Sequence, residues 1–164
     1  ILAVRLGWYK IYYPLEFYAS YFTVRNGDFA AEEAVKGHGA VKFRLEQLLH
    51  KGNERSVKEN DEFNIILIIN EMMARGFSFL PVDLYKSHAT KYTIEDGKIR
   101  LPFTALKGLG GAAAEGLQQA AIEGSFISID EVQNRAGVSK SVIELLDQMG
   151  AFGYLPKTSQ ITFF

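Results

Sequence analysis

The residues best able to do chemistry lie in the stretch LKGLGGAAAEGL, where three glycines stand directly before a run of alanines. Glycine is the costliest ordinary residue in a helix and alanine is the best helix former, so this order predicts a tight turn followed by a helix. Gly108, Gly110 and Gly111 have no Cβ atom, which lets a partner approach the backbone closely. The first amide groups of the following helix lack an intrahelical acceptor, and a phosphate oxygen fits that position.

Three interpretations of this turn compete. A plain joint between two helices needs glycine only to end the first helix. A dinucleotide-binding turn needs a parallel strand before it and an acidic residue about twenty positions later, and the sequence offers neither. In a helix-hairpin-helix, Leu106 ends the first helix, Gly108-Leu109-Gly110 forms the hairpin, and Ala114 lets the second helix pack closely. We favour this third interpretation, which predicts binding of a sugar-phosphate backbone without reading of the bases.

The charge of the chain limits how nucleic acid can bind. The formal net charge is −1, and residues 101–164 contain fewer basic than acidic side chains. A broad basic surface is therefore excluded as the source of affinity, whereas amide groups and a helix dipole need no such surface. We predict a local DNA-backbone site, with one charge-assisted contact from its lysine. The site consists of Lys107, Gly108, Leu109, Gly110 and Gly111.

A second candidate hairpin lies in ISIDEVQNRAGVSKSVIELL. Gly137, Ser139 and Lys140 occupy its turn, and an apolar helix follows. It lacks the second glycine, so the sequence leaves open whether this hairpin contacts DNA or is structural only.

Neither a catalytic site nor a metal site is predicted in this chain. There is no cysteine, and His38, His50 and His88 lie far apart with no metal-ligand spacing. No spaced pair of carboxylates on a strand offers a two-metal site. The aromatic run near the start is interrupted by charged residues and a proline and cannot span a bilayer. These features predict a cytoplasmic protein that does not enter a membrane, and the first residue, Ile1, suggests a piece of a longer chain.

The predicted fold is mainly α with one small β-hairpin. Tyr92-Thr93-Ile94 and Lys98 to Leu101, joined by an Asp-Gly turn, form the hairpin. Helices are predicted over Leu2 to Tyr12, Pro14 to Phe22, Phe29 to Val35 with Asp28 as N-cap, Val41 to Leu49, Phe63 to Met73 with a cap at Asn60 or Asp61, Phe103 to Leu106, Ala112 to Glu123, Ile129 to Arg135, and Lys140 to Met149.

Four parts are expected along the chain. They are a helical fingers-type region (1–80), an extended connection with the hairpin (81–101), a helix-hairpin-helix DNA-binding region (102–149) and a C-terminal tail (150–164).

Three stretches, taken in order, resemble one family. VRLGWYKIYYPLEFYASYF is similar to its aromatic fingers helices. NEMMARGFSFLPVDLYKSHATKYTIEDGKIR followed by LPFTALKGLGG resembles the segment that joins the fingers to the helix-hairpin-helix region. The family is the alpha subunit of bacterial DNA polymerase III, in the PolC branch, where the proofreading 3′-5′ exonuclease is built into the same chain. The resemblance covers essentially the whole sequence.

The resemblance implies a C-terminal part of a replicative DNA-directed DNA polymerase, a nucleotidyltransferase active in DNA replication. In that family the acids that hold Mg²⁺ lie in the palm, upstream of this sequence, so no cofactor and no polymerase activity are implied for this chain alone. Its implied role is to grip double-stranded primer-template DNA behind the active site, together with the remainder of the polymerase chain.

The end of the sequence, SQITFF, resembles the short peptide with which PolC chains bind the sliding clamp. The peptide has a glutamine, an aliphatic residue, a small polar residue and two apolar or aromatic residues. A glutamine amide supplies directional hydrogen bonds while the apolar residues enter a pocket. The implied clamp-binding residues are Gln160, Ile161, Thr162, Phe163 and Phe164.

Two rival functions stay open on the residues alone. A helix-hairpin-helix module also fits a DNA repair or recombination protein, although no catalytic constellation for such a protein stands out before residue 100. A helical protein-binding domain would use the aromatic first segment as its interface. DNA binding separates this last class from the other two.

Overall fold

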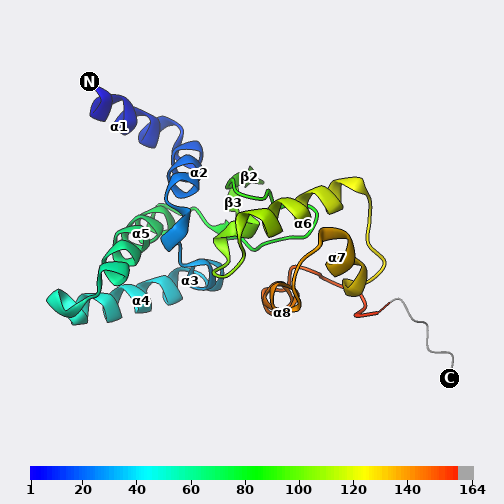
Figure 1. The fold of residues 1–164 in the computed structure, drawn as a ribbon. Coiled ribbons are helices and arrows are strands. Elements are labelled where there is room, and N and C mark those ends of the chain that lie inside the picture. The colour runs from blue at the N-terminus through cyan, green and yellow to red at the C-terminus, as the bar shows by residue number, and fades with distance from the viewer. Residues whose placement is uncertain (159–164) are drawn as a thin grey trace. The chain divides into compact units, whose positions relative to one another are not determined.

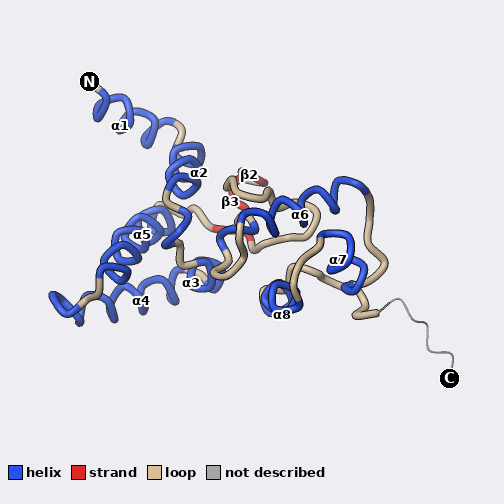
Figure 2. The backbone as a smooth tube through the Cα atoms, viewed as in Figure 1, coloured by secondary structure: helices blue, strands red, loops and turns tan. Residues whose placement is uncertain are grey.

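The computed structural model describes residues 1–158, and helices dominate this part of the chain (Figure 1 and Figure 2). The predicted fold class, mainly α with one small β-hairpin, is confirmed. The α-helices are α1 (Leu2–Tyr12), α2 (Pro14–Val24), α3 (Ala31–Lys36), α4 (His38–Lys51), α5 (Val57–Ala74), α6 (Gly111–Glu123), α7 (Ile129–Ala136) and α8 (Lys140–Gln148). Short 3-10 helices are η1 (Asn26–Asp28), η2 (Gly52–Glu54) and η3 (Phe103–Ala105), and the strands are β1 (Phe79–Leu80), β2 (Thr93–Glu95) and β3 (Lys98–Arg100).

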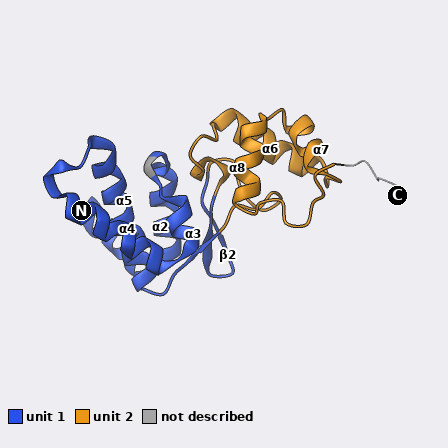
Figure 3. Ribbon diagram, turned by 90° about the horizontal axis from the view of Figure 1, so that it is seen from below, with its two compact units in different colours: residues 1–80, 91–101 blue, residues 81–90, 102–164 orange. Residues whose placement is uncertain are grey.

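The chain divides into two compact units (Figure 3). Unit 1 contains residues 1–80 and 91–101, and unit 2 contains residues 81–90 and the chain from residue 102 onward. The connection expected over residues 81–101 is therefore shared, because its strands belong to unit 1 and its first part packs in unit 2.

The first two helices of unit 1 are separated at Pro14, as the sequence predicted. Helix α1 ends at Tyr12, and Pro14 occupies the first turn of α2, where its missing N–H is not needed. The expected cap at Asp28 is wrong. Asp28 ends η1, and α3 begins at Ala31 with no side-chain cap.

Helix α5 begins earlier than the sequence predicted, and the expected caps at Asn60 and Asp61 are wrong. Ser56 accepts a hydrogen bond from the Glu59 amide at 3.2 Å, and the Glu59 carboxylate accepts one from the Ser56 amide at 2.9 Å. This capping box satisfies two amides that a helix start leaves without acceptors. A hydrogen bond from Lys51 holds the pKa of Glu59 down to about 2, so the cap stays charged.

An aromatic cluster fills the core of unit 1. The ring centroid of Phe29 lies 5.3 Å from that of Phe22, 5.3 Å from that of Phe79 and 5.1 Å from that of Tyr92. The Tyr92 hydroxyl donates to the Asn26 side chain at 2.7 Å, and burial raises the pKa of Tyr92 well above its ordinary value. The cluster joins α2 and η1 to the sheet.

The sheet of unit 1 has the order β1-β3-β2. The predicted hairpin is confirmed, since β2 and β3 pair antiparallel with Ile94 opposite Ile99. Asp96 and Gly97 both have positive φ, as a two-residue hairpin turn requires. Strand β1 adds a parallel pair, with Phe79 opposite Ile99.

Unit 2 is built from η3, α6, α7 and α8 with residues 81–90 wrapped onto them. The amides of Phe103 and Thr104 donate to the carbonyls of His88 and Ala89 at 3.1 Å each. The Ala89 amide in turn donates to the Gln118 side chain of α6 at 2.8 Å. These bonds make residues 81–90 part of unit 2, although they lie far from α6 in sequence.

Helix α6 packs on the end of α7 through a glycine. A Cβ atom at Gly116 would lie 2.5 Å from the Ala136 carbonyl oxygen, which is too close for any side chain. Nearby, Arg135 of α7 donates to the carbonyls of Ala120 at 2.7 Å and Gly124 at 3.3 Å, so α6 ends on α7. Gly116 is therefore required by packing, at a cost to helix propensity.

We predict that Gly116→Ala destabilises unit 2 by about 1–3 kcal/mol, because the new methyl meets backbone oxygen in a packed site. In an open helix the same change normally stabilises by about 0.5–1 kcal/mol. Urea unfolding measures the difference. Gly39→Ala in α4, where the structure leaves open space for a Cβ, is the matched control. A Gly116→Ala chain as stable as the Gly39→Ala chain would contradict this packing.

Candidate nucleic-acid interface

The predicted hairpin is a tight turn between η3 and α6. Leu106 follows η3 in an extended conformation, and Gly108 has φ of 96°, which L residues rarely adopt. The Leu109 amide donates to the Leu106 carbonyl at 3.1 Å, and the Leu109 side chain is buried. Leu109 thus fixes the turn from the inside, and Gly108 is required by the backbone.

The next two glycines have no such requirement. Gly110 has φ of −75° and ψ of 161°, an extended conformation that any residue adopts. A Cβ atom at Gly110 or at Gly111 would meet open space. Both residues are exposed. Neither the backbone angles nor the packing of the chain therefore accounts for glycine at these two positions.

The amides at the start of α6 are open. The first helical bond of α6 runs from the Ala114 amide to the Gly110 carbonyl at 3.0 Å. Within residues 1–158, no acceptor lies opposite the amides of Gly110, Gly111, Ala112 and Ala113. Lys107 is exposed beside them. The helix dipole adds partial positive charge at this point, so the arrangement attracts an anion.

Close packing behind the turn holds α6 in place. Ala114 and Leu117 are fully buried, as the helix-hairpin-helix interpretation predicted for them, and Leu106 is also buried. The turn follows η3 and no strand, so a dinucleotide-binding turn is excluded.

The turn between α7 and α8 resembles the first hairpin in its glycine, its buried apolar residue and its last residue. Gly137 is left-handed with φ of 65°, and Val138 after it is buried, like Leu109. Ser139 precedes α8 with φ of −73° and ψ of 159°, within 2° of both angles of Gly110. A serine in place of the second glycine therefore leaves the backbone angles at this position unchanged.

Helix α8 also begins with open amides. The Val142 and Ile143 amides both donate to the Ser139 carbonyl, at 3.1 and 3.2 Å. Among the described residues, none accepts from the amides of Ser139, Lys140 or Ser141, and all three residues are exposed. Two hydroxyls and one ammonium group therefore surround this helix start.

Helix α7, in contrast, is closed by its own chain. Ser128 accepts from the Glu131 amide at 3.2 Å, and the Ile129 and Asp130 amides donate to the carbonyls of Pro156 and Lys157. The open helix starts of unit 2 are thus those that follow a glycine turn. The sequence showed the first through its glycine pair, and it gave only a weak signal for the second.

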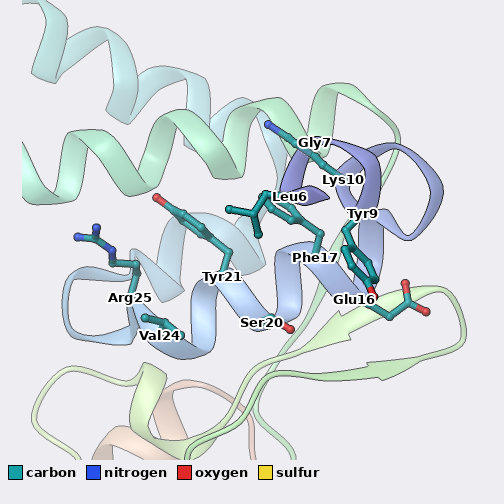
Figure 4. A pocket seen from close by; sticks show the side chains of 10 residues that line it. All are labelled: Leu6, Gly7, Tyr9, Lys10, Glu16, Phe17, Ser20, Tyr21, Val24 and Arg25. Carbon is teal, nitrogen blue, oxygen red and sulfur yellow. The ribbon is translucent and has the colours of Figure 1, made fainter. Parts of the chain in front are cut away.

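Unit 1 carries an apolar groove of about 730 Å³ between α1 and α2 (Figure 4). No residue of α1 is buried. The groove is lined by Leu6, Gly7, Tyr9, Lys10, Glu16, Phe17, Ser20, Tyr21, Val24 and Arg25. Such an apolar surface is typical of a contact with another protein surface.

A polar network ties α1 to the rest of unit 1. Glu71 of α5 accepts hydrogen bonds from Lys10 and from the Tyr18 hydroxyl, each at 2.8 Å. Arg75 donates to the Tyr18 hydroxyl and to the Lys10 carbonyl, each at 3.1 Å. Burial acts to raise the pKa of Glu71, but the hydrogen bonds from Lys10 and Tyr18 outweigh it and lower that pKa overall. The network fixes the orientation of α1.

No group of three or more His, Cys, Asp or Glu side chains that could hold a metal ion occurs within residues 1–158. In the same part of the chain, no helix is long and apolar enough to cross a membrane. The predicted clamp-binding residues, Gln160, Ile161, Thr162, Phe163 and Phe164, lie outside the described residues.

Comparisons with known proteins agree with this geometry. A family model described as a helix-hairpin-helix motif matches residues 76–160. The chain is 44% identical over 164 residues to DNA polymerase III PolC-type of Clostridium perfringens, covering 100% of this chain and 11% of that protein. It is 40% identical over 163 residues to the same protein of Thermotoga petrophila (99% and 12%) and 40% identical over 164 residues to that of Bacillus cereus (100% and 11%). The chain thus spans about a tenth of the length of these relatives.

Substitutions at Gly108 and Gly110 should distinguish a glycine that the backbone conformation requires from one that the fold does not require. We predict that Gly108→Ala destabilises unit 2 by about 1–2 kcal/mol, because alanine is strained at positive φ. Gly110→Ala should change stability by less than about 0.5 kcal/mol, since its Cβ meets open space. Thermal unfolding of the two variants provides the measurement, and equal losses would contradict the assigned turn geometry.

Proposed function

The chain belongs to the helix-hairpin-helix family and is a region of a PolC-type DNA polymerase III, and we propose that it grips duplex DNA and a sliding clamp during replication. The catalytic steps, nucleotidyl transfer with Mg²⁺ and 3′-5′ exonuclease action, are assigned to other parts of the longer polymerase. The described residues of this chain offer no metal site for them. A replicative polymerase of this kind works in the cytoplasm.

One observation carries the DNA proposal. Gly110 and Gly111 are glycines that the fold does not need, and they stand beside amides that the fold does not use. A partner whose backbone comes within hydrogen-bond distance explains both facts. A DNA phosphate fits, because its oxygens accept from several amides at once and its charge is favoured at a helix N-terminus. Lys107 supplies a charge-assisted contact beside it, and Gly108 and Leu109 set the shape of the turn.

The hairpin before α8 extends the proposal to a second phosphate contact. Like the first hairpin, it has a left-handed glycine, a buried apolar residue and an extended last residue, and the amides of Ser139, Lys140 and Ser141 are open. Ser139 and Ser141 add hydroxyl donors, and Lys140 adds a charge. All the contacts proposed for the two hairpins go to phosphates, so binding is expected to be independent of sequence.

The clamp contact is proposed for residues 160–164. The glutamine, the aliphatic residue and the final aromatic pair of SQITFF match the type of peptide that enters an apolar pocket with one polar anchor. The family of the chain supports the assignment, because a polymerase that stays on DNA for long stretches needs a tether.

The exposed face of α1 is proposed to contact the remainder of the polymerase chain. The relatives are far longer than this chain, so further parts of the polymerase are available as partners. The apolar groove beside α1 supplies a surface on which such a part can pack. The two rival functions lose support. A repair or recombination protein does not explain why the whole of this chain matches PolC-type polymerases. A purely protein-binding domain does not explain the open hairpin amides.

Gly110→Val in the complete polymerase should weaken binding of primer-template duplex about tenfold, because the isopropyl group keeps a phosphate from the open amides. Lys107→Gln should weaken binding similarly across sequences and reduce the salt slope by about one ion. Fluorescence anisotropy over a range of salt concentrations measures both effects. Gly27→Val is the matched control, since a Cβ there also meets open space and the residue lies in unit 1. Unchanged affinity in Gly110→Val would refute the hairpin site.

Deletion of residues 160–164 should abolish association with the sliding clamp and leave DNA binding intact, because the hairpins lie elsewhere in the chain. Surface plasmon resonance with immobilised clamp measures the first property, and anisotropy with free duplex measures the second. A deletion variant that binds the clamp as tightly as the intact polymerase would contradict the peptide assignment.

A further inference from the structure

The chain after α8 does not leave unit 2. Ala151 and Phe152 are buried, at 5% and 6% exposure. The Ala151 amide donates to the Leu146 carbonyl at 3.0 Å, and the Ala151 carbonyl accepts from the Leu84 amide at 3.2 Å. The sequence alone assigned residues from Gly150 to a tail. Residues 151–157, the docked segment, instead begin with two buried residues and end with two carbonyls hydrogen-bonded to α7.

The docked segment ends on the first turn of α7. The Ile129 amide donates to the Pro156 carbonyl at 2.9 Å, and the Asp130 amide donates to the Lys157 carbonyl at 3.1 Å. A helix start leaves such amides without intrahelical acceptors, so the two carbonyls give each amide an acceptor that α7 cannot supply itself. Pro156 restricts its own φ and keeps the preceding residue extended, which orders the segment before it docks.

The point at which the segment ends is close to the proposed clamp peptide. Only Thr158 and Ser159 separate Lys157 from Gln160. Three trans peptide steps span at most about 11 Å between Cα atoms. The proposed peptide therefore begins only three residues after the carbonyl held by α7, and both hairpins lie in the same compact unit as that carbonyl.

We propose that the docked segment is a positioning device for clamp capture. The hydrogen bond between Asp130 and Lys157 fixes the residue that precedes the linker to the peptide. Clamp binding by the peptide is thereby coupled to DNA binding by the hairpins of the same unit. This inference rests on the proposed clamp function. Two contacts carried by one rigid unit act at high effective concentration, and a long flexible spacer between them lowers it.

Two changes in the complete polymerase test the coupling. The first inserts ten glycine and serine residues between Thr158 and Ser159, which leaves every residue of the docked segment in the sequence. The second is Ile129→Pro, which removes the N–H that bonds Pro156 while keeping a residue that the first helical position accepts. Ser128 before it is already extended, as a residue before proline must be. Ile129→Ala is the matched control, because it loses the side chain and keeps the N–H.

Each variant is measured in two clamp-binding assays and one DNA-binding assay. Binding to free clamp without DNA should stay within about twofold of the intact polymerase, since the peptide is unchanged. Binding to a clamp loaded on primed DNA should weaken about three- to tenfold for the insertion and for Ile129→Pro, and less for Ile129→Ala. Affinity for duplex without clamp should be constant, which shows that unit 2 is folded.

The outcomes separate this inference from the proposed function. If the intact polymerase does not bind free clamp, the clamp proposal itself fails. If it binds, and the insertion variant holds loaded clamp as tightly as the intact polymerase, the positioning role is overturned. An equal loss in both clamp-binding assays would also overturn it, because the change would then act on the peptide and not on the coupling.

Discussion

Every helix begins with amides that its own backbone cannot satisfy, and unit 2 depends on how each of these starts is treated. Helix α7 receives a serine side chain and two carbonyls from later in the chain. Helices α6 and α8 receive nothing from the described residues. The first amides of α7 thus bond the chain to itself, whereas the first amides of α6 and α8 remain available to a phosphate. This division leaves positions that favour an anion in a chain whose net charge is −1.

Glycine serves three different physical purposes within one short stretch. Gly108 supplies a positive φ, Gly116 makes room for the Ala136 carbonyl, and Gly110 with Gly111 leaves the backbone open to solvent. The first two are requirements of the fold, and their substitution acts on stability. The last has no structural reason in the chain, and it is the one that points to a ligand. Stability and binding can therefore be altered separately within the same hairpin.

Features set by neighbouring residues could be predicted from the sequence, and those set by distant ones could not. The break at Pro14, the Asp96-Gly97 turn and the start of α6 follow from local backbone preferences. The Ser56 capping box is also local, but the charged residues after it resembled a connection. The docked segment, the wrapped residues 81–90 and the contact of Gly116 each join parts far apart in sequence. For the candidate site, the glycines indicated the turn, whereas only the structure shows which amides are open.

The chain contains one tryptophan, and the fold places it on the exposed face of α1. The Trp8 side chain is 47% exposed, and its ring lies 5.0 Å from that of Tyr12 and 5.6 Å from that of Tyr13. Its fluorescence therefore arises from a single indole that is partly in water. A partner that covered this face would shift the emission of Trp8 to shorter wavelength, so this indole can report such a contact without an attached dye.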